Sequence, residues 1–386
     1  ATAADRSIAH GVAEHLGLFD TVIASDGERN LKSSAKLEAI SLACGPEFDY
    51  IGDSKADVPV WNASRRAIAV SGGRSAARSL VRQGREVETI GVTPVVWRSA
   101  LRALRPHQWA KNALIFLPLL ASHIYTDVGL WERDLLAFVA FSLCASCVYI
   151  VNDLLDLESD RRHPRKRRRP FASGELSIPF GIAASLGLLL VSAAIASLSG
   201  GAFLATLAIY FALTVSYSLK LKAVVLIDTV VLAGLYTMRV VAGYAATGIV
   251  ATFWLLAFAL FLFFGLAMLK RFSELMDLRK RNQDSTPGRG YRAEDLDIVG
   301  IFGAVTGCLA ILVLAFYINT EEVTRLYAHP QVLWGIVPVL LYWTSKIWLI
   351  AHRGEMHEDP VVYALTDRES LAVFGITACI ALAATF

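Results

Sequence analysis

The sequence predicts an all-α, polytopic membrane protein that crosses the bilayer nine times and is preceded by a smaller soluble region. The chain of 386 residues is 55% hydrophobic and only 18% charged, whereas about a quarter of the residues in a soluble domain are charged. The composition also changes along the chain, because it is mixed up to Trp97 and dominated by long apolar runs from Trp109 onward. In that second part the charges gather between the runs. We therefore expect two domains, residues 1–97 and 98–386.

Nine apolar runs approach the length of about 20 residues that a membrane-spanning helix needs. The first is short and contains Pro118, and the third and fourth are separated only by Ser199, Gly200 and Gly201. The predicted spans are 111–126, 133–151, 178–198, 201–217, 223–246, 251–270, 296–318, 331–351 and 370–386.

The distribution of Lys and Arg predicts the orientation of these spans. The loops after the second, fourth, sixth and eighth spans hold eighteen Lys and Arg residues, whereas the loops on the other side hold two, Arg133 and Arg325. Basic loops stay in the cytoplasm. We therefore expect the N-terminal region in the cytoplasm, the C-terminus outside, and a multi-pass protein of the cytoplasmic (inner) membrane.

A row of acidic residues follows the second span. Asn152, Asp156 and Asp160 recur every four residues, with Asp153 beside them, so on a helix they share one face. Like charges repel there and are costly to desolvate near a membrane. Mg²⁺ would relieve both costs, since it binds one or two carboxylates together with phosphate oxygens and water. We interpret the row as a binding site for a metal-bound diphosphate. The alternative is that Arg161–Arg169 is only a topology signal, with the acids as its solvated counter-ions.

Polar residues also follow the other predicted cytoplasmic ends. Taken singly, each is typical of an interfacial charge, but together they surround one face of the bundle and predict a single polar chamber. Glu274 and Asp277 are three residues apart and form a candidate second acidic site. The full set is Lys111, Asn112, Tyr217, Lys220, Lys222, Lys270, Arg271, Glu274, Asp277 and Arg368.

The stretch Asn152–Asp160, NDLLDLESD, resembles the NDxxDxxxD signature of the UbiA superfamily of intramembrane prenyltransferases. The resemblance covers about residues 100–386. It implies a bundle of nine transmembrane helices and a diphosphate bound through Mg²⁺ to Asp153, Asp156 and Asp160. The family has a second motif, DxxxD, after its sixth helix, where this chain has Glu274-Leu-Met-Asp277. This departure weakens the interpretation as an aromatic prenyltransferase.

Further segments are similar to one branch of that superfamily, the decaprenyl-phosphate phosphoribosyltransferases. These segments are Arg105–Asn112, His163–Pro170, Tyr217–Lys222, Arg271–Leu275 and Asp359–Arg368. The resemblance implies Mg²⁺-dependent transfer of a phosphoribosyl group from phosphoribosyl pyrophosphate to a polyprenyl phosphate, with release of pyrophosphate. Asn152, Asp153, Asp156 and Asp160 would act on the donor diphosphate, and Glu274 and Asp277 would bind ribose hydroxyls or a second metal. The residues expected to hold phosphates are Lys111, Lys166, Arg169, Lys220, Lys222, Lys270 and Arg271.

The sequence does not assign individual basic residues to the lipid or to the donor. An aromatic prenyltransferase that uses a polyprenyl diphosphate is the alternative function. A transporter is disfavoured, because it would place polar groups near the midplane, whereas the charges here gather at one face. We expect the bilayer and both substrates as partners, no nucleic acid, and we leave a homo-oligomer open.

The N-terminal region has its own signature. Asp53 and Asp57 lie in GDSKAD after a short apolar stretch, and residues 67–70 form a predicted strand. This pattern is similar to the last metal-binding motif of the haloacid dehalogenase superfamily, which implies an α/β domain with Lys36 and Thr2 as phosphate-binding residues. The DxDGT-like nucleophile segment of that superfamily is missing. We therefore expect a partial domain with a vestigial phosphatase site, and a fragment of a longer protein rather than a decayed domain.

Overall fold

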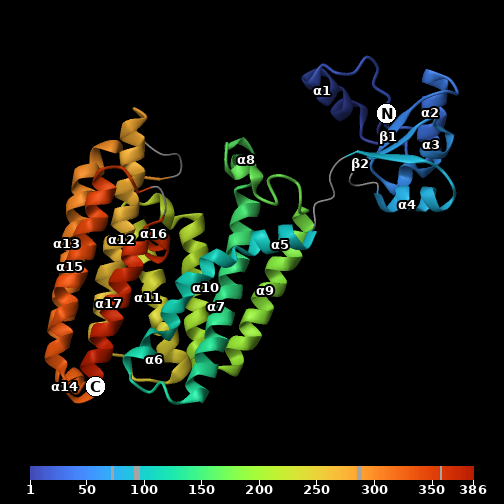
Figure 1. Ribbon diagram of the computed structural model, residues 1–386. Coiled ribbons are helices and arrows are strands. Elements are labelled where there is room, and N and C mark those ends of the chain that lie inside the picture. The colour runs from blue at the N-terminus through green and yellow to red at the C-terminus, as the bar shows by residue number, and fades with distance from the viewer. Residues whose placement is uncertain (71–73, 91–95, 285–288, 357–358) are drawn as a thin grey trace. The chain divides into compact units, whose positions relative to one another are not determined.

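The computed structural model describes residues 1–70, 74–90, 96–284, 289–356 and 359–386 (Figure 1). It divides into two compact units, Ala1–Val96 and Trp97–Phe386. Each unit has hydrophobic clusters of its own.

The N-terminal unit contains a three-stranded parallel sheet in the order β1-β2-β3. Tyr50 pairs with Ala67, and Ala67 pairs with Val87. Parallel neighbours need a crossover connection, and a helix lies in each one. Trp61 and Leu80 come from these helices and are fully buried in the core. The elements are α1 (Arg6–Leu16), α2 (Ser34–Cys44), β1 (Tyr50–Gly52), α3 (Val58–Ala63), β2 (Ala67–Val70), α4 (Arg74–Arg82) and β3 (Val87–Ile90).

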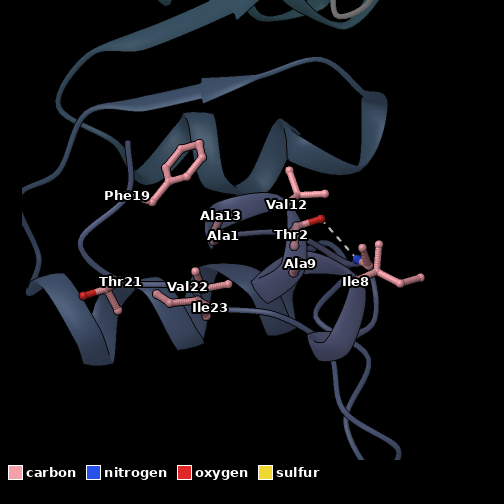
Figure 2. Close-up of a pocket in the computed structure, with 11 residues that line it drawn as sticks. Ala1, Thr2, Ile8, Ala9, Val12, Ala13, Phe19, Thr21, Val22 and Ile23 are labelled. Carbon is pink, nitrogen blue, oxygen red and sulfur yellow. Dashed lines mark hydrogen bonds between the residues drawn. The ribbon is translucent and has the colours of Figure 1, made fainter. Parts of the chain in front are cut away.

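A hollow of about 310 Å³ lies between α1 and residues 19–23 of this unit. Figure 2 shows its lining, which is mostly apolar and includes Ile8, Val12 and Phe19. These three side chains are exposed to solvent over about half of their surface or more. The hollow has no charged side chain in its lining.

The C-terminal unit is helical, and its long helices run side by side in Figure 1. Eight helices of the described residues are long and apolar enough to cross a membrane. The elements are α5 (Val96–Leu104), the 3₁₀ helix η3 (Pro106–Phe116), α6 (Leu117–Ala121), α7 (Val128–Leu155), α8 (Leu157–Arg162), α9 (Ile178–Leu198), α10 (Gly201–Leu219), α11 (Ile227–Thr247), α12 (Phe253–Lys280), α13 (Leu296–Ile318), α14 (Glu321–Leu326), α15 (Ile336–His352), α16 (Pro360–Thr366) and α17 (Arg368–Thr385).

The structure differs from the sequence prediction at the first span. Residues 111–126 do not form one long α-helix, because η3 is followed by the five-residue α6, which has Pro118 in its first turn. Proline has no backbone N–H and interrupts a helix in which it would be an interior residue. The η3 backbone also packs directly on α11, where the carbonyl of Ile115 approaches Gly243 so closely that no Cβ would fit. The count of nine spans therefore stays a prediction beside the eight candidates found among the described residues.

Small residues allow the helices to pack closely. A Cβ added to Gly303 or Gly307 on α13 would collide with Trp348 or Thr344 of α15. Close approach at small residues is typical of membrane helix interfaces. Large apolar side chains such as Leu190 on α9 and Ile301 on α13 are exposed instead. A wide exposed apolar surface of this kind marks contact with a membrane.

Candidate active site in the helical bundle

A cavity of about 390 Å³, the central cavity, lies among η3 and the helices α7, α10, α11 and α12. On α7 its lining extends from Asn152 back to Ala145, and on α11 from Leu232 to Arg239. We call the end at Asn152 the motif end and the end at Arg239 the deep end. The lining residues are Arg105, Gln108, Lys111, Ala145, Val148, Tyr149, Asn152, Tyr210, Thr214, Tyr217, Ser218, Leu232, Leu235, Tyr236, Arg239, Lys270 and Asp359.

The acidic row lies where α7 passes into α8. The backbone N–H of Asp156 donates to the carbonyl of Asn152 at 2.9 Å, and that of Asp160 donates to Asp156 at 2.8 Å. This is the bonding pattern of an α-helix, so the four-residue spacing is kept across the junction. Asn152 lines the cavity, Asp153 and Asp160 are buried, and Asp156 is half-buried.

Two arginines hold the buried carboxylates of this row. Arg169 Nη1 donates to Asp153 Oδ1 at 3.1 Å and to Asp160 Oδ2 at 2.6 Å. Arg105 Nη2 donates to Asp153 Oδ1 at 2.5 Å. The guanidinium fork suits carboxylates better than the ammonium of lysine does. The two arginines, one just before η3 and one after α8, thus neutralise Asp153 and Asp160 but form no ion pair with Asp156 among the described residues.

The residues of this row fit a Mg²⁺ ion in part. Asp160 Oδ1 is buried and has no hydrogen-bond partner among the described residues, so it is an available hard oxygen ligand. No group of three or more His, Cys, Asp or Glu side chains in the described ranges is close enough to hold a metal alone. Mg²⁺ commonly uses one or two carboxylates with substrate phosphate and water. The row therefore fits an ion that arrives with a phosphate ligand.

Asp359 links two lysines at the wall of the cavity. Its side chain lies 2.7 Å from Lys270 Nζ and 3.6 Å from Lys111 Nζ. It also caps α16 by accepting from the N–H of Val361. Burial alone would raise the pKa of Asp359, but the two lysines outweigh this effect and lower it to about 2. The sequence analysis includes Asp359 in a family-like segment but does not identify it as a site residue.

Arg239, in the middle of α11, was also missed by the sequence analysis. Its guanidinium donates to Asn112 Oδ1 at 2.8 Å and to the hydroxyl of Tyr210 at 3.0 Å. Asn112 is itself buried and donates to Ser142 Oγ at 3.0 Å. The available signal was an arginine inside an apolar span, where an ionisable residue is costly and usually functional.

A second charged network surrounds Arg271 in the C-terminal third of α12. Its Nε lies 2.6 Å from Asp228 Oδ2, and its other nitrogens contact Glu274 and the hydroxyl of Tyr217. Tyr217 belongs to the cavity wall, so the network reaches the central cavity through it. Glu274 faces Arg271 and Arg289. Asp277, its proposed partner in a second acidic site, is exposed and has no bonded side-chain partner among the described residues.

Four of the residues predicted to bind substrate do not line the central cavity. None of them belongs to its lining or forms an ion pair with another described residue. Three are exposed and the fourth, Lys222, is half-buried. They are Lys166, Lys220, Lys222 and Arg368. Their roles stay predictions.

In the N-terminal unit, Asp57 is the centre of a buried polar cluster. Its Oδ1 accepts from Lys36 at 2.8 Å and from Tyr50 at 2.9 Å, and its Oδ2 accepts from the N–H groups of Asp53 and Ser54. Burial would raise the pKa of Asp57, but these bonds lower it overall. The Asp53 side chain is exposed.

Thr2 is not bonded to this cluster. Its Oγ1 accepts from the N–H of Ala4 at 3.1 Å, and it lines the apolar hollow beside α1. The structure thus brings Lys36 and Asp57 into contact, with the Asp53 backbone beside them, and leaves Thr2 in a different environment.

The fold and the cavity define an integral membrane protein with a charged chamber among its helices. Residues 113–352 match the UbiA prenyltransferase family, and the chain belongs to that family. The fold agrees, because a UbiA homolog from Archaeoglobus fulgidus bound to GPP and Mg²⁺ superposes with a TM-score of 0.54 at 17% identity, covering 74% of this chain and 99% of that chain. The protein is accordingly an enzyme, a transferase.

Three curated relatives are similar to the chain. The uncharacterized protein y4nM of Sinorhizobium fredii is 38% identical over 98% of this chain and 73% of its own length. The nodulation protein NoeC of Azorhizobium caulinodans is 38% identical over 70% of this chain and 87% of its own. The decaprenyl-phosphate phosphoribosyltransferase of Corynebacterium glutamicum is 34% identical, but the match covers 48% of this chain and 60% of that protein.

Proposed function

We propose that this chain is a Mg²⁺-dependent transferase that moves a phosphoribosyl group from phosphoribosyl pyrophosphate to a polyprenyl phosphate and releases pyrophosphate. The observation that carries the proposal is the central cavity, which has four basic side chains and one acidic side chain in its lining and the Asn152–Asp160 row at one end. Such a cavity suits substrates that carry several phosphates. The similarity to decaprenyl-phosphate phosphoribosyltransferases, 34% to 37% identical over part of their length, supports the same substrates.

The residues of the chain suggest how the reaction would proceed. Asp153, Asp156 and Asp160, with Asn152, would hold Mg²⁺, which when bound neutralises the charge of the leaving pyrophosphate. Arg105 and Arg169 keep Asp153 and Asp160 in position. An oxygen of the lipid phosphate forms the new bond to C1 of the ribose as the bond from C1 to pyrophosphate breaks. The lipid phosphate is already an anion, so this step needs no general base.

The remaining basic residues would bind the phosphate groups and the lipid headgroup region. Lys111 and Lys270 face the central cavity, and Arg271 supports Tyr217 at its wall. Lys166, Lys220, Lys222 and Arg368 would act at the membrane surface, where basic side chains attract anionic lipid. Glu274 and Asp277 are proposed for the ribose hydroxyls. The distribution of basic loops supports a cytoplasmic-membrane protein with its N-terminus and active site in the cytoplasm and its C-terminus outside.

We also propose that residues 1–97 form an α/β domain of the haloacid dehalogenase type, separate from a transferase domain over residues 98–386. Its parallel sheet supports this, because Asp53 follows β1 directly and so lies at the carboxyl edge of the sheet. The buried pair of Lys36 and Asp57 lies beside that edge. No catalytic activity is proposed for this domain.

The function can be tested by product analysis. Purified protein in detergent is given Mg²⁺, a polyprenyl phosphate and phosphoribosyl pyrophosphate, and the lipid product is weighed by mass spectrometry. We expect a lipid heavier by one phosphoribosyl unit, absent with Asp156→Asn and retained with Glu158→Gln, whose exposed side chain pairs only with Arg162 among the described residues. Turnover of a polyprenyl diphosphate with a phenolic acceptor, and none of the phosphoribosyl donor, would instead identify an aromatic prenyltransferase.

A further inference from the structure

The two ends of the central cavity are chemically different. The lining extends over eight residues on both α7 and α11, and the seven steps between the first and the last of them rise about 10 Å in an α-helix. The motif end lies beside a carboxylate row that fits a metal-bound diphosphate. The deep end contains Arg239 instead. A substrate group bound there would be too far from the motif end to share the same contacts.

Arg239 has no charged partner at the deep end. Its side chain is buried, with 6% of the residue exposed. All three of its hydrogen-bond acceptors are neutral, namely Asn112 Oδ1, the hydroxyl of Tyr210 and the carbonyl of Leu235. No carboxylate of the described residues lies within ion-pair distance of it. A guanidinium has five N–H donors, so one N–H on each terminal nitrogen remains for a ligand.

The surroundings stabilise this charge without neutralising it. The guanidinium lies 5.1 Å from the ring centre of Tyr210 and 5.3 Å from that of Tyr236, and Lys111 Nζ lies 5.6 Å from the Tyr236 ring. Aromatic faces attract cations. Lys111 must share its one carboxylate, Asp359, with Lys270. The deep end is therefore positively charged, and a buried cation without a counter-ion is unfavourable.

We propose that Arg239 and Lys111 form a subsite for a phosphate monoester at the deep end, separate from the diphosphate-binding site at the motif end. The two free N–H groups of Arg239 suit bidentate binding of phosphate oxygens, and Lys111 adds a point charge. The inference rests on the proposed function, in which two substrate groups are phosphate monoesters. These are the 5-phosphate of the ribosyl donor and the phosphate of the lipid.

Binding measurements on the full chain in detergent test the subsite without any turnover. Isothermal titration would use ribose 5-phosphate, a short-chain prenyl monophosphate, and pyrophosphate with Mg²⁺ as probes. The variants are Arg239→Gln, Arg239→Lys and, as a charge-matched control, the exposed Arg353→Gln. We expect Arg239→Gln to weaken one monoester by about 10- to 100-fold, the effect of losing hydrogen bonds to a charged group. Pyrophosphate with Mg²⁺ should change less than about 3-fold.

The binding results decide whether the subsite exists and which substrate it binds. Weaker binding of ribose 5-phosphate alone assigns the subsite to the donor, and weaker binding of the prenyl monophosphate alone assigns it to the lipid. Equal weakening of all three probes, unchanged affinity for both monoesters, or no monoester binding by the wild type overturns the subsite. If Arg239→Gln does not fold, a folded Arg239→Lys protein with wild-type affinity for both monoesters also overturns it.

The proposed function can fail separately from the subsite. A wild-type protein that binds a monoester through Arg239 but makes no phosphoribosyl lipid would overturn the function and leave the subsite standing. A wild-type protein that makes this lipid, together with an Arg239→Gln variant that keeps the KM of both substrates, would overturn only the subsite.

Discussion

Tyr291 lies just before α13, and its hydroxyl makes two hydrogen bonds in a buried position. The hydroxyl donates to Asp228 Oδ1 at 2.7 Å and accepts from the N–H of Leu226 at 2.9 Å. Only 3% of the residue is exposed, and burial raises the pKa of Tyr291 to about 12, so it remains a donor at neutral pH. Leu226 has a φ of 65°, a strained value for a residue with a side chain. Tyr291 therefore fixes both a buried carboxylate and the start of α11.

The variant Tyr291→Phe removes this hydroxyl and keeps the ring, so no large cavity is created. A hydrogen bond to a charged group contributes about 1.5 to 3 kcal/mol and a neutral one about 0.5 to 1.5 kcal/mol. Because both partners are left in buried positions, we expect a loss of about 2 to 4 kcal/mol in the free energy of unfolding. At roughly 2 °C per kcal/mol for a large domain, Tm should fall by on the order of 5 °C.

Thermal unfolding in detergent, followed by tryptophan fluorescence, measures this change. The matched control is Tyr342→Phe, because Tyr342 is 58% exposed and makes no side-chain hydrogen bond to another described residue. In an Asp228→Asn background the Tyr291→Phe change should cost less, since the two residues share a bond. A Tyr291→Phe protein that unfolds at the same temperature as Tyr342→Phe would refute this account of the network.

Three other predictions follow from the described contacts. Asp153→Asn should lower product formation by at least about 10- to 100-fold, because it removes a proposed Mg²⁺ ligand and the carboxylate that Arg105 and Arg169 hold. Glu158→Gln should leave product formation unchanged, and equal activities of the two variants would contradict this prediction. The pKa of Asp359 is lowered to about 2, so its ion pairs contribute about 2 kcal/mol above the unfolded pKa near 4, a contribution lost as pH falls toward 2. The Tm values of wild type and Asp359→Asn should therefore differ at pH 6 and converge near pH 2, and a constant difference would argue against it. Asp57→Ala should destabilise the N-terminal unit by about 3 to 5 kcal/mol, because Lys36 loses its buried partner. Hydrogen exchange of residues 1–96 in the full chain measures the loss, with Asp53→Asn as the control. Equal protection of the amides in the two variants would contradict this prediction.

Local sequence patterns predicted much of this protein. Apolar run lengths located the membrane helices of the second unit, because a bilayer sets the length of a spanning helix. The four-residue spacing of Asn152, Asp156 and Asp160 predicted a polar row, and the helical bonding pattern is preserved across the α7–α8 junction. The first span was the exception. A hydropathy run does not report that Pro118 and the close approach of Gly243 favour a 3₁₀ helix followed by a short α6.

Sequence by itself determined what depends on neighbours along the chain, namely the helices, the acidic row and the family. Tertiary structure decided which distant residues meet. Arg239 bonds to Asn112 across 127 positions, and Arg105 and Arg169 converge on Asp153 from either side of α7. Such contacts depend on how the helices pack, because the burial that makes an unpaired charge costly arises only when the bundle has formed. For this reason only the folded structure shows that the Arg239 charge at the deep end of the central cavity has no ion-pair partner among the described residues.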